Sequence, residues 1–289
     1  MSAAWAWLRR NALRIYAALA VAYMLIPIFV IAVFSFGNTP RDKLTFGLEH
    51  GFTLEYWETI FSLPELNEAL LTSLRLAAFA TLISTAIGTA MAMALVRHRF
   101  RGRRATNLLI VIPMATPEVV IGAALLSMFI YYSFALGFTS LLIAHVMFSI
   151  SFVVVVVRSR LIGFDRNLEE AAADLGATPF ATFRTVTLPL LAPGVIAAAL
   201  LAFALSIDDF VISNFNSGTT VTFPLYVYGV SLRGIPVQVN ALATLLFVLI
   251  VVAVSLVLIQ QRRAERMAAV RPEQEGPPPI PAPGAAAAT

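Results

Sequence analysis

The 289-residue chain contains no cysteine and only one lysine, Lys43. Without cysteine it cannot form a disulfide, a thiolate metal site or a cysteine nucleophile. A phosphate-binding P-loop needs a lysine between a glycine and a serine or threonine, but Lys43 stands between Asp42 and Leu44. The chain therefore does not bind ATP through a P-loop of its own.

Charged residues of both signs are also scarce. They make up 12% of the chain, about half the share of a soluble domain, whereas 59% of the residues are hydrophobic. The net charge is +4, but the arginines form short clusters between long apolar runs. A nucleic-acid-binding domain gathers its basic residues on one soluble face, so this distribution excludes nucleic acid as the partner and favours membrane lipid.

Six apolar runs are long enough to cross a bilayer core, which needs about 20 helical residues. Backbone groups in lipid must be paired within the segment, so we expect helices and an all-α membrane protein. The expected spans are residues 15–36, 74–96, 107–131, 138–157, 193–214 and 239–259. Gly137 is the expected break before the fourth span. The first run lacks a clear cleavage site, which favours an uncleaved span over a signal peptide.

The arginines also predict orientation. Most of them lie in the N-terminal segment, in the second and fourth connections and in the C-terminal tail, which places both termini in the cytoplasm. We therefore expect a cytoplasmic segment 1–14, a transmembrane domain 15–260 with an external loop 37–73 and a cytoplasmic loop 158–192, and a cytoplasmic tail 261–289. The tail is rich in proline and alanine, and we expect disorder there.

The external loop places Leu54, Trp57 and Phe61 on one helical face, with Thr53 as a candidate N-cap. Two interpretations stay open. The segment is either a short helix on the membrane surface or a docking edge for an external partner.

The cytoplasmic loop predicts two short helices. Asn167 can cap the first, with Glu170 three residues on, and Gly176 can end it in the left-handed conformation. Thr178 can cap the second, with Pro179 at its first position. Four large apolar side chains in these helices either contact a partner or pack on the chain's own bundle: Leu168, Leu175, Phe180 and Phe183.

The same loop resembles the EAA signature of ABC importer permeases. The family pattern is Glu-Ala-Ala, three residues, Gly, nine residues, an aliphatic residue, one residue and Leu-Pro. This chain departs from it only in carrying valine where the family usually has isoleucine. The matching residues are Glu170, Ala171, Ala172, Gly176, Val186, Leu188 and Pro189. The resemblance extends over about residues 15–260.

The resemblance implies a type I importer permease fold and a division of labour between chains. The loop would be a coupling segment that docks on a separate ATPase subunit, with Glu170, Ala171 and Gly176 in the docking segment. Two ATPase subunits would bind ATP and Mg, a second related permease would complete the pathway, and an external binding protein would deliver the solute. This chain would hold no cofactor, catalyse no reaction and lie in a bacterial inner membrane.

Three acids fall inside expected spans, namely Glu118, Asp208 and Asp209. A charge there costs at least about 2.5 kcal/mol and usually faces the bundle interior or a water path. No lysine or arginine lies at similar depth, so the acids suit a cationic solute. The alternative is that they satisfy helix ends or a subunit interface.

On the fifth span, steps of three and four residues predict one polar stripe, formed by Ser206, Asp209, Ser213 and Asn216. Asp208 would point about 100° away from it. Our candidate pathway residues are Asp209, Asp208, Glu118 and Ser213. For His145, on the fourth span, we expect an interhelical hydrogen bond and not a transport role.

Residues 206–218 and 222–228 resemble the second permease subunit of spermidine/putrescine transporters, which implies a polyamine solute. Related permeases for iron(III), thiosulfate or aminophosphonate share parts of this pattern, and Asn214 and Asn216 depart from it. The sequence also leaves two other protein classes to compare with an importer permease. An ion-coupled transporter could use the three acids as proton sites, but it leaves the loop signature unexplained. A membrane enzyme has no visible nucleophile, metal or cofactor constellation.

Overall fold

The computed structural model describes residues 3–38, 51–165 and 167–270. All named elements in these ranges are helices. A single isolated backbone bridge joins Gly37 to Phe52 at the ends of the undescribed part of the external loop. The expectation of an all-α chain is confirmed for the described residues.

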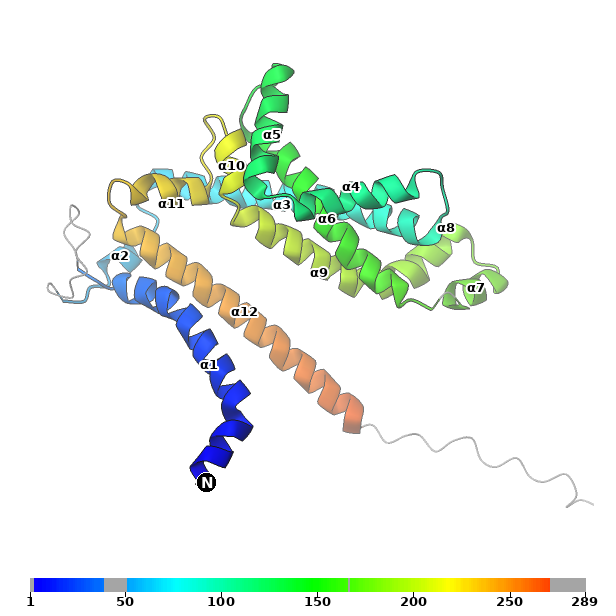
Figure 1. Ribbon diagram of the computed structural model, residues 1–289, viewed down its shortest axis with the longest axis horizontal. Coiled ribbons are helices and arrows are strands. Elements are labelled where there is room, and N and C mark those ends of the chain that lie inside the picture. Colours follow the sequence, from blue (N-terminus) through cyan, green and yellow to red (C-terminus); the bar gives the residue numbers. More distant parts are fainter. Residues whose placement is uncertain (1–2, 39–50, 166, 271–289) are drawn as a thin grey trace, which may run out of the picture.

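Three long helices form the core of the molecule: α3 (Pro64–Arg97), α6 (Phe138–Ile162) and α9 (Leu188–Ile207). They pack against one another along their lengths (Figure 1). Small residues at four-residue spacing line the buried face of α3, namely Ala80, Ser84, Gly88 and Ala92. Small side chains let helix backbones approach closely in a membrane protein, where association depends on packing.

Gly88 marks the tightest of these contacts. A Cβ atom at this position would lie 2.6 Å from Cγ1 of Val153 on α6. We expect Gly88→Val to destabilise the helix pair by about 1–3 kcal/mol, as overpacking does in a dense core. Ala90→Val adds bulk on the exposed side of the same helix and is the matched control.

The measurement is the thermal unfolding midpoint of the purified protein in detergent. Gly88→Val should unfold at a lower temperature than both the wild type and Ala90→Val, and adding Val153→Ala should recover part of the loss. Equal midpoints for the two valine variants would show that the close approach at Gly88 does not hold the pair together.

Four helical segments in the described part are long and apolar enough to cross a membrane: 11–34 within α1 (Ala3–Phe34), α3, α6 and the stretch Pro179–Ile207 that ends in α9. A fifth is obtained if α4 (Arg103–Ala115) and α5 (Glu118–Tyr131) count together. The expected sixth span lies in α12 (Val237–Val270), of which Val237–Val252 is a shorter apolar helix. α12 also runs past the expected tail boundary at residue 260, while residues 271–289 lie outside the described part.

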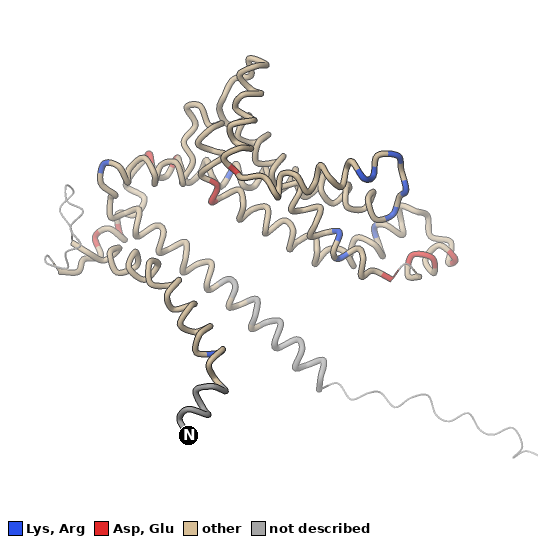
Figure 2. The backbone as a smooth tube through the Cα atoms, in the orientation of Figure 1, with Lys and Arg blue, Asp and Glu red and all other residues tan. Residues whose placement is uncertain are grey.

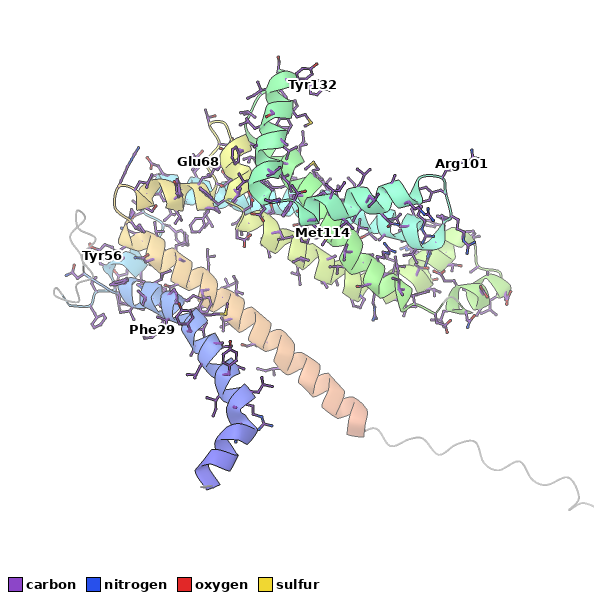
Figure 3. All side chains as sticks on the ribbon, viewed as in Figure 1. Phe29, Tyr56, Glu68, Arg101, Met114 and Tyr132 are labelled. Atoms are coloured by element: carbon purple, nitrogen blue, oxygen red, sulfur yellow. The ribbon has the colours of Figure 1, made fainter. Side chains whose placement is uncertain are left out.

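The third expected span is not one helix. α4 and α5 meet at 112° around Thr116 and Pro117. The sequence predicts a kink near Pro113 and Pro117, but the bend is far larger than a kinked helix makes. α5 projects away from the bundle, with Tyr132 at its tip (Figure 3). Each half is only about 20 Å long, too short to span the bilayer core alone.

The fifth expected span, 193–214, is also wrong as one continuous helix. α9 ends at Ile207, and a separate helix, α10 (Val211–Asn216), follows the break at Asp208 to Phe210. The expected break at Gly137 is confirmed, because α6 begins directly after it.

An apolar cluster joins the start of α12 to the start of α3. α1 packs along α12, and α2 (Glu55–Glu58) contacts α12, while α11 (Phe223–Ser231) lies beside α3. Thr53 is not the N-cap that the sequence predicts, because that position is held by Leu54, but its hydroxyl accepts a hydrogen bond from the N–H of Glu55. Trp57 stacks on Phe36 with ring centroids 5.1 Å apart, whereas its expected helical neighbours Leu54 and Phe61 are exposed.

Charged residues gather in three places along the bundle. Most described arginines lie at the end that carries the α3–α4 connection and α7 (Asn167–Asp174), together with the acids of α7, and other acids lie near the opposite end of α3 (Figure 2). Arg101 and Glu68 mark these two ends (Figure 3). A third group of acids lies in the middle of the molecule, at the helix break.

Candidate functional site

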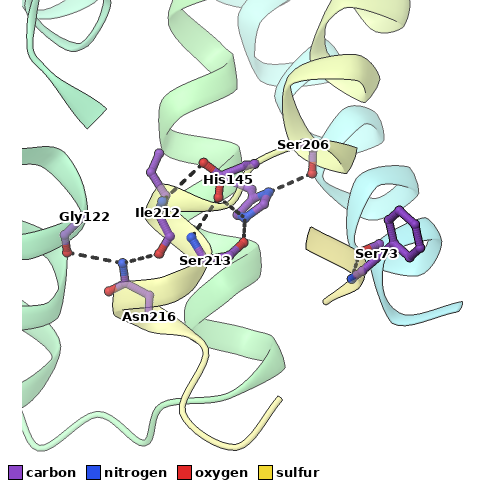
Figure 4. Close-up of polar contacts among 9 residues, drawn as sticks. Ser73, Gly122, His145, Ser206, Ile212, Ser213 and Asn216 are labelled. Atoms are coloured by element: carbon purple, nitrogen blue, oxygen red, sulfur yellow. Dashed lines mark hydrogen bonds and ion pairs between the residues drawn. The ribbon is translucent and has the colours of Figure 1, made fainter. Parts of the chain in front are cut away.

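Asp209 lies in the break between α9 and α10, and its side chain binds the first turn of α10. Its carboxylate accepts the N–H groups of Ile212 at 3.2 Å and Ser213 at 2.8 Å (Figure 4). The first N–H groups of a helix have no intrahelical partner, and an acidic side chain satisfies them well. The break is therefore stabilised by the acid within it, and Asp209 itself is buried.

His145 of α6 joins both sides of this break. Its Nδ1 lies 2.8 Å from Oγ of Ser206, and its Nε2 lies 3.1 Å from Oγ of Ser213 and 3.5 Å from the Asp209 carboxylate (Figure 4). The imidazole is almost completely buried. The expected interhelical hydrogen bond of His145 is confirmed. Three members of the expected polar stripe meet at this ring although their helix is broken.

Asn216, the fourth member of the stripe, connects α10 to α5 instead. Its side-chain amide donates to the carbonyl of Ile212 at 2.9 Å and to that of Gly122 on α5 at 3.3 Å. A Cβ at Gly122 would lie 2.8 Å from the ring of Phe215, so α5 and α10 approach closely here. This contact joins α5 to α10 beside the helix break.

Asp208 differs from its neighbour in being exposed. It lines a cavity of about 550 Å³ between α3, α9, α11 and α12 whose other walls are almost entirely apolar or aromatic. Phe210 and Tyr228 face this cavity with ring centroids 4.8 Å apart. Among the described residues, no other residue donates a hydrogen bond to the Asp208 carboxylate or pairs with its charge.

Glu118, the first residue of α5, is also exposed and lies close enough to Asp208 and Asp209 for their charges to act on it. The structure thus brings the three acids of the expected spans to one region. No described lysine or arginine forms an ion pair with any of them. Within the described chain, His145 is the only basic side chain in contact with any of the three acids, and it contacts Asp209.

A second cavity, of about 380 Å³, lies at the acidic end of α3. Glu65 and Glu68 line it together with Thr72, Thr220 and Tyr226. Burial and the nearby charge of Glu65 raise the pKa of the Tyr226 phenol above its usual value. This cavity was not predicted, although Glu65 and Glu68, two acids three residues apart at a helix start, are a signal that the sequence contains.

The cytoplasmic loop folds much as its local signals predict. Gly176 ends α7 with φ of +83°, and the Thr178 hydroxyl accepts the N–H of Ala181 at the start of α8 (Pro179–Thr182). Asn167 is not the cap that the sequence predicts. It is the first helical residue, and its N–H is bound by the carboxylate of Asp165 at 3.0 Å. A π-helical segment, η2 (Phe183–Thr187), then leads directly into α9.

Most of the motif in this loop faces away from the chain. Leu175 and Phe180 are 89% and 73% exposed, and Leu168 is exposed as well. Among the signature residues, Glu170, Ala171, Gly176, Leu188 and Pro189 are exposed, whereas Ala172 and Val186 are half-buried. Packing on the chain's own bundle therefore does not explain the apolar side chains of α7 and α8.

A family model described as the binding-protein-dependent transport system inner membrane component matches residues 84–266. The spermidine/putrescine transport system permease protein PotC of Haemophilus influenzae is 39% identical over 83% of this chain and 91% of its own length. PotC of Escherichia coli K12 is 41% identical over 81% and 87%. The putrescine permease protein PotI of the same strain is 35% identical over 79% and 83%.

Solved structures show the same fold at low sequence identity. A bacterial ABC transporter that imports the acidic polysaccharide alginate has a TM-score of 0.62 at 17% identity, covering 90% of this chain and 98% of that one. The alginate transporter in complex with a pentasaccharide-bound periplasmic protein also has a TM-score of 0.62, at 15% identity over 91% and 97%.

Proposed function

We propose that this chain, which belongs to the binding-protein-dependent transport system inner membrane components, is a permease subunit that imports polyamines at the expense of ATP. The observation that carries the substrate is the similarity of about four-fifths of the chain to spermidine/putrescine permeases. The three acids around the helix break support it independently, because no described cation neutralises them.

We further propose the arrangement in the membrane. The chain crosses a bacterial inner membrane six times, with the bent pair α4–α5 as the third span, the pair α9–α10 as the fifth and α12 as the sixth. Both termini and the loop 158–192 lie in the cytoplasm, where arginines gather. A second related permease completes the pathway and an external binding protein supplies the solute. The chain itself makes or breaks no bond.

The exposed acids would meet the solute first. Asp208 combines a carboxylate with the rings of Phe210 and Tyr228, and a primary ammonium group interacts favourably with both kinds of partner. The apolar walls of the same cavity suit the methylene segments between the nitrogen atoms of a polyamine. Glu118 adds charge beside it. Asp209 and Ser213 are buried beneath these exposed acids, and the hydrogen bond between them stabilises the helix break.

The exposed faces of α7 and α8 would dock on an ATPase subunit. Ala171 lets a partner helix seat closely, and Leu175 and Phe180 supply apolar contact area. Two such ATPase subunits, with ATP and Mg bound to them, would drive the exchange between inward- and outward-facing states of the permease pair.

Co-purification tests this assignment. The tagged chain is solubilised from membranes that express the whole transport system, and the accompanying chains are identified by mass spectrometry. We expect a P-loop ATPase and a second permease, with ATPase activity stimulated by spermidine plus the binding protein. If an ATPase co-purifies but spermidine and the binding protein do not stimulate it, the solute is another one, such as iron(III), thiosulfate or an aminophosphonate. Recovery of this chain alone would contradict the importer assignment.

A further inference from the structure

Glu169, the residue before the signature glutamate, turns back toward the bundle. Its Oε1 accepts a hydrogen bond from the guanidinium of Arg97 at 2.5 Å, and the same oxygen accepts the hydroxyl of Thr187. Glu170 is exposed on the outer side of the same helix. Two adjacent carboxylates of α7 therefore have different surroundings, one open to a partner and one bound within the chain.

The residues bound by Glu169 belong to the core helices. Arg97 is the last residue of α3, and Thr187 is the fully buried last residue of η2, directly before α9. The Arg97 guanidinium also lies 5.9 Å from the ring centroid of Phe164, just beyond the end of α6. Glu169 thus connects α7 to the end of α3 and to the start of α9, and Arg97 extends the contact to Phe164 beside the end of α6.

The charges also suit the helix ends that carry them. Glu169 lies in the first turn of α7, and Arg97 in the last turn of α3. The helix dipole favours an acid in the first turn of a helix and a base in the last turn. Their side chains are mostly buried, at 18% and 22% exposure, so water weakens this ion pair less than a fully exposed one.

α7 has little else to hold it. None of its residues is buried, and it packs mainly against α8 and η2, which belong to the same loop. We propose that Glu169 is a positioning residue that fixes the docking helix to the transmembrane bundle through Arg97 and Thr187, so that movement of the ATPase reaches α3 and α9. This role rests on the proposed function, because it requires an ATPase at the outer face of α7.

The test uses the complete importer in proteoliposomes and measures solute taken up per ATP hydrolysed. Arg97→Glu and Glu169→Arg should each lower this ratio about fivefold or more, a change typical of coupling between two sites. The ATPase should still co-purify, since neither residue lies on the exposed docking face. Arg101→Glu removes an exposed arginine from the same end of the bundle and should leave the ratio unchanged (Figure 3).

The double variant Arg97→Glu/Glu169→Arg separates positioning from general damage. It restores the ion pair in reverse, and arginine can still hydrogen-bond the Thr187 hydroxyl, so most of the ratio should return. If a single reversal prevents assembly, Glu169→Gln keeps an acceptor for Thr187 but loses the charge, and should lower the ratio more mildly.

The outcomes distinguish the two levels of the proposal. A wild-type complex without ATP-driven uptake would refute the proposed function and this role with it. A coupled wild type whose Arg97 and Glu169 variants keep a normal ratio would overturn the role of Glu169 alone. So would a double variant that assembles but stays uncoupled.

Discussion

Asp208→Asn is expected to lower uptake of a polyamine strongly while the complex still assembles. The carboxylate is exposed in an apolar, aromatic cavity and makes no bond that the fold needs among the described residues. A hydrogen bond to a charged group contributes about 1.5–3 kcal/mol, which is roughly tenfold to hundredfold in apparent affinity. The loss should appear mainly as a raised KM for radiolabelled spermidine in proteoliposomes.

Asp209→Asn is the matched control, because we expect this variant to lose stability, whereas Asp208→Asn should fold normally. Its two carboxylate oxygens accept two backbone N–H groups of α10. An amide has one acceptor oxygen, so one buried N–H loses its partner at a cost of about 1–3 kcal/mol. We expect less folded protein and a lower unfolding midpoint. Wild-type uptake by Asp208→Asn, together with a stable but inactive Asp209→Asn, would show that Asp209 and not Asp208 contacts the solute.

Gly176→Val is expected to uncouple transport from ATP hydrolysis without lowering the amount of protein in the membrane. Gly176 has φ of +83°, a conformation that a β-branched residue adopts only with strain of about 1–3 kcal/mol. A Cβ there would meet nothing within 4 Å, so the effect comes from the backbone and not from a clash. The turn between α7 and α8 should change direction, and the two halves of the docking face should no longer fit one partner.

Gly176→Asn provides the control for this variant. Asparagine tolerates the left-handed conformation better than other residues with a side chain, and it adds similar bulk at the same exposed position. We expect it to transport nearly as well as the wild type, whereas Gly176→Val should hydrolyse ATP with little uptake. Full transport in Gly176→Val, or equal loss in both variants, would show that the left-handed turn is not what the docking surface requires.

The loop was predictable because its structure depends on near neighbours. Gly176, Thr178 and Pro179 each act within one helical turn, so their sequence positions are sufficient to place the ends of α7 and α8. The error at Asn167 is of the same local kind. The N–H of Asn167, which Glu170 would accept in a capping box, is bound instead by Asp165, two residues earlier.

The helix break could not be read from hydropathy. Residues 193–214 are mostly apolar and contain neither glycine nor proline at residues 208–210, so the run indicates one helix. What stabilises the break is the capping by Asp209 and its contact with His145, which is 64 residues away in the chain. An adjacent pair of aspartates inside an apolar run was the available signal, since aspartate is a favoured helix cap.

Long-range partners explain the other omissions. Pro113 and Pro117 predict a kink, but the contacts that join α5 to α10, made by Asn216 and Phe215 beside Gly122, come from residues about 94 positions away in the chain. Similarly, the signature directs attention to Glu170, whereas the bound acid is Glu169. Its main partner, Arg97, is 72 residues distant, and no local pattern identifies that pair.

The most direct test of the central proposal is spermidine uptake by proteoliposomes that contain the complete complex, with ATP trapped inside and the binding protein outside. We expect uptake that requires internal ATP and continues when a protonophore abolishes the proton gradient. Uptake that follows the gradient and ignores ATP would contradict an ATP-driven importer and favour an ion-coupled transporter built on the three acids.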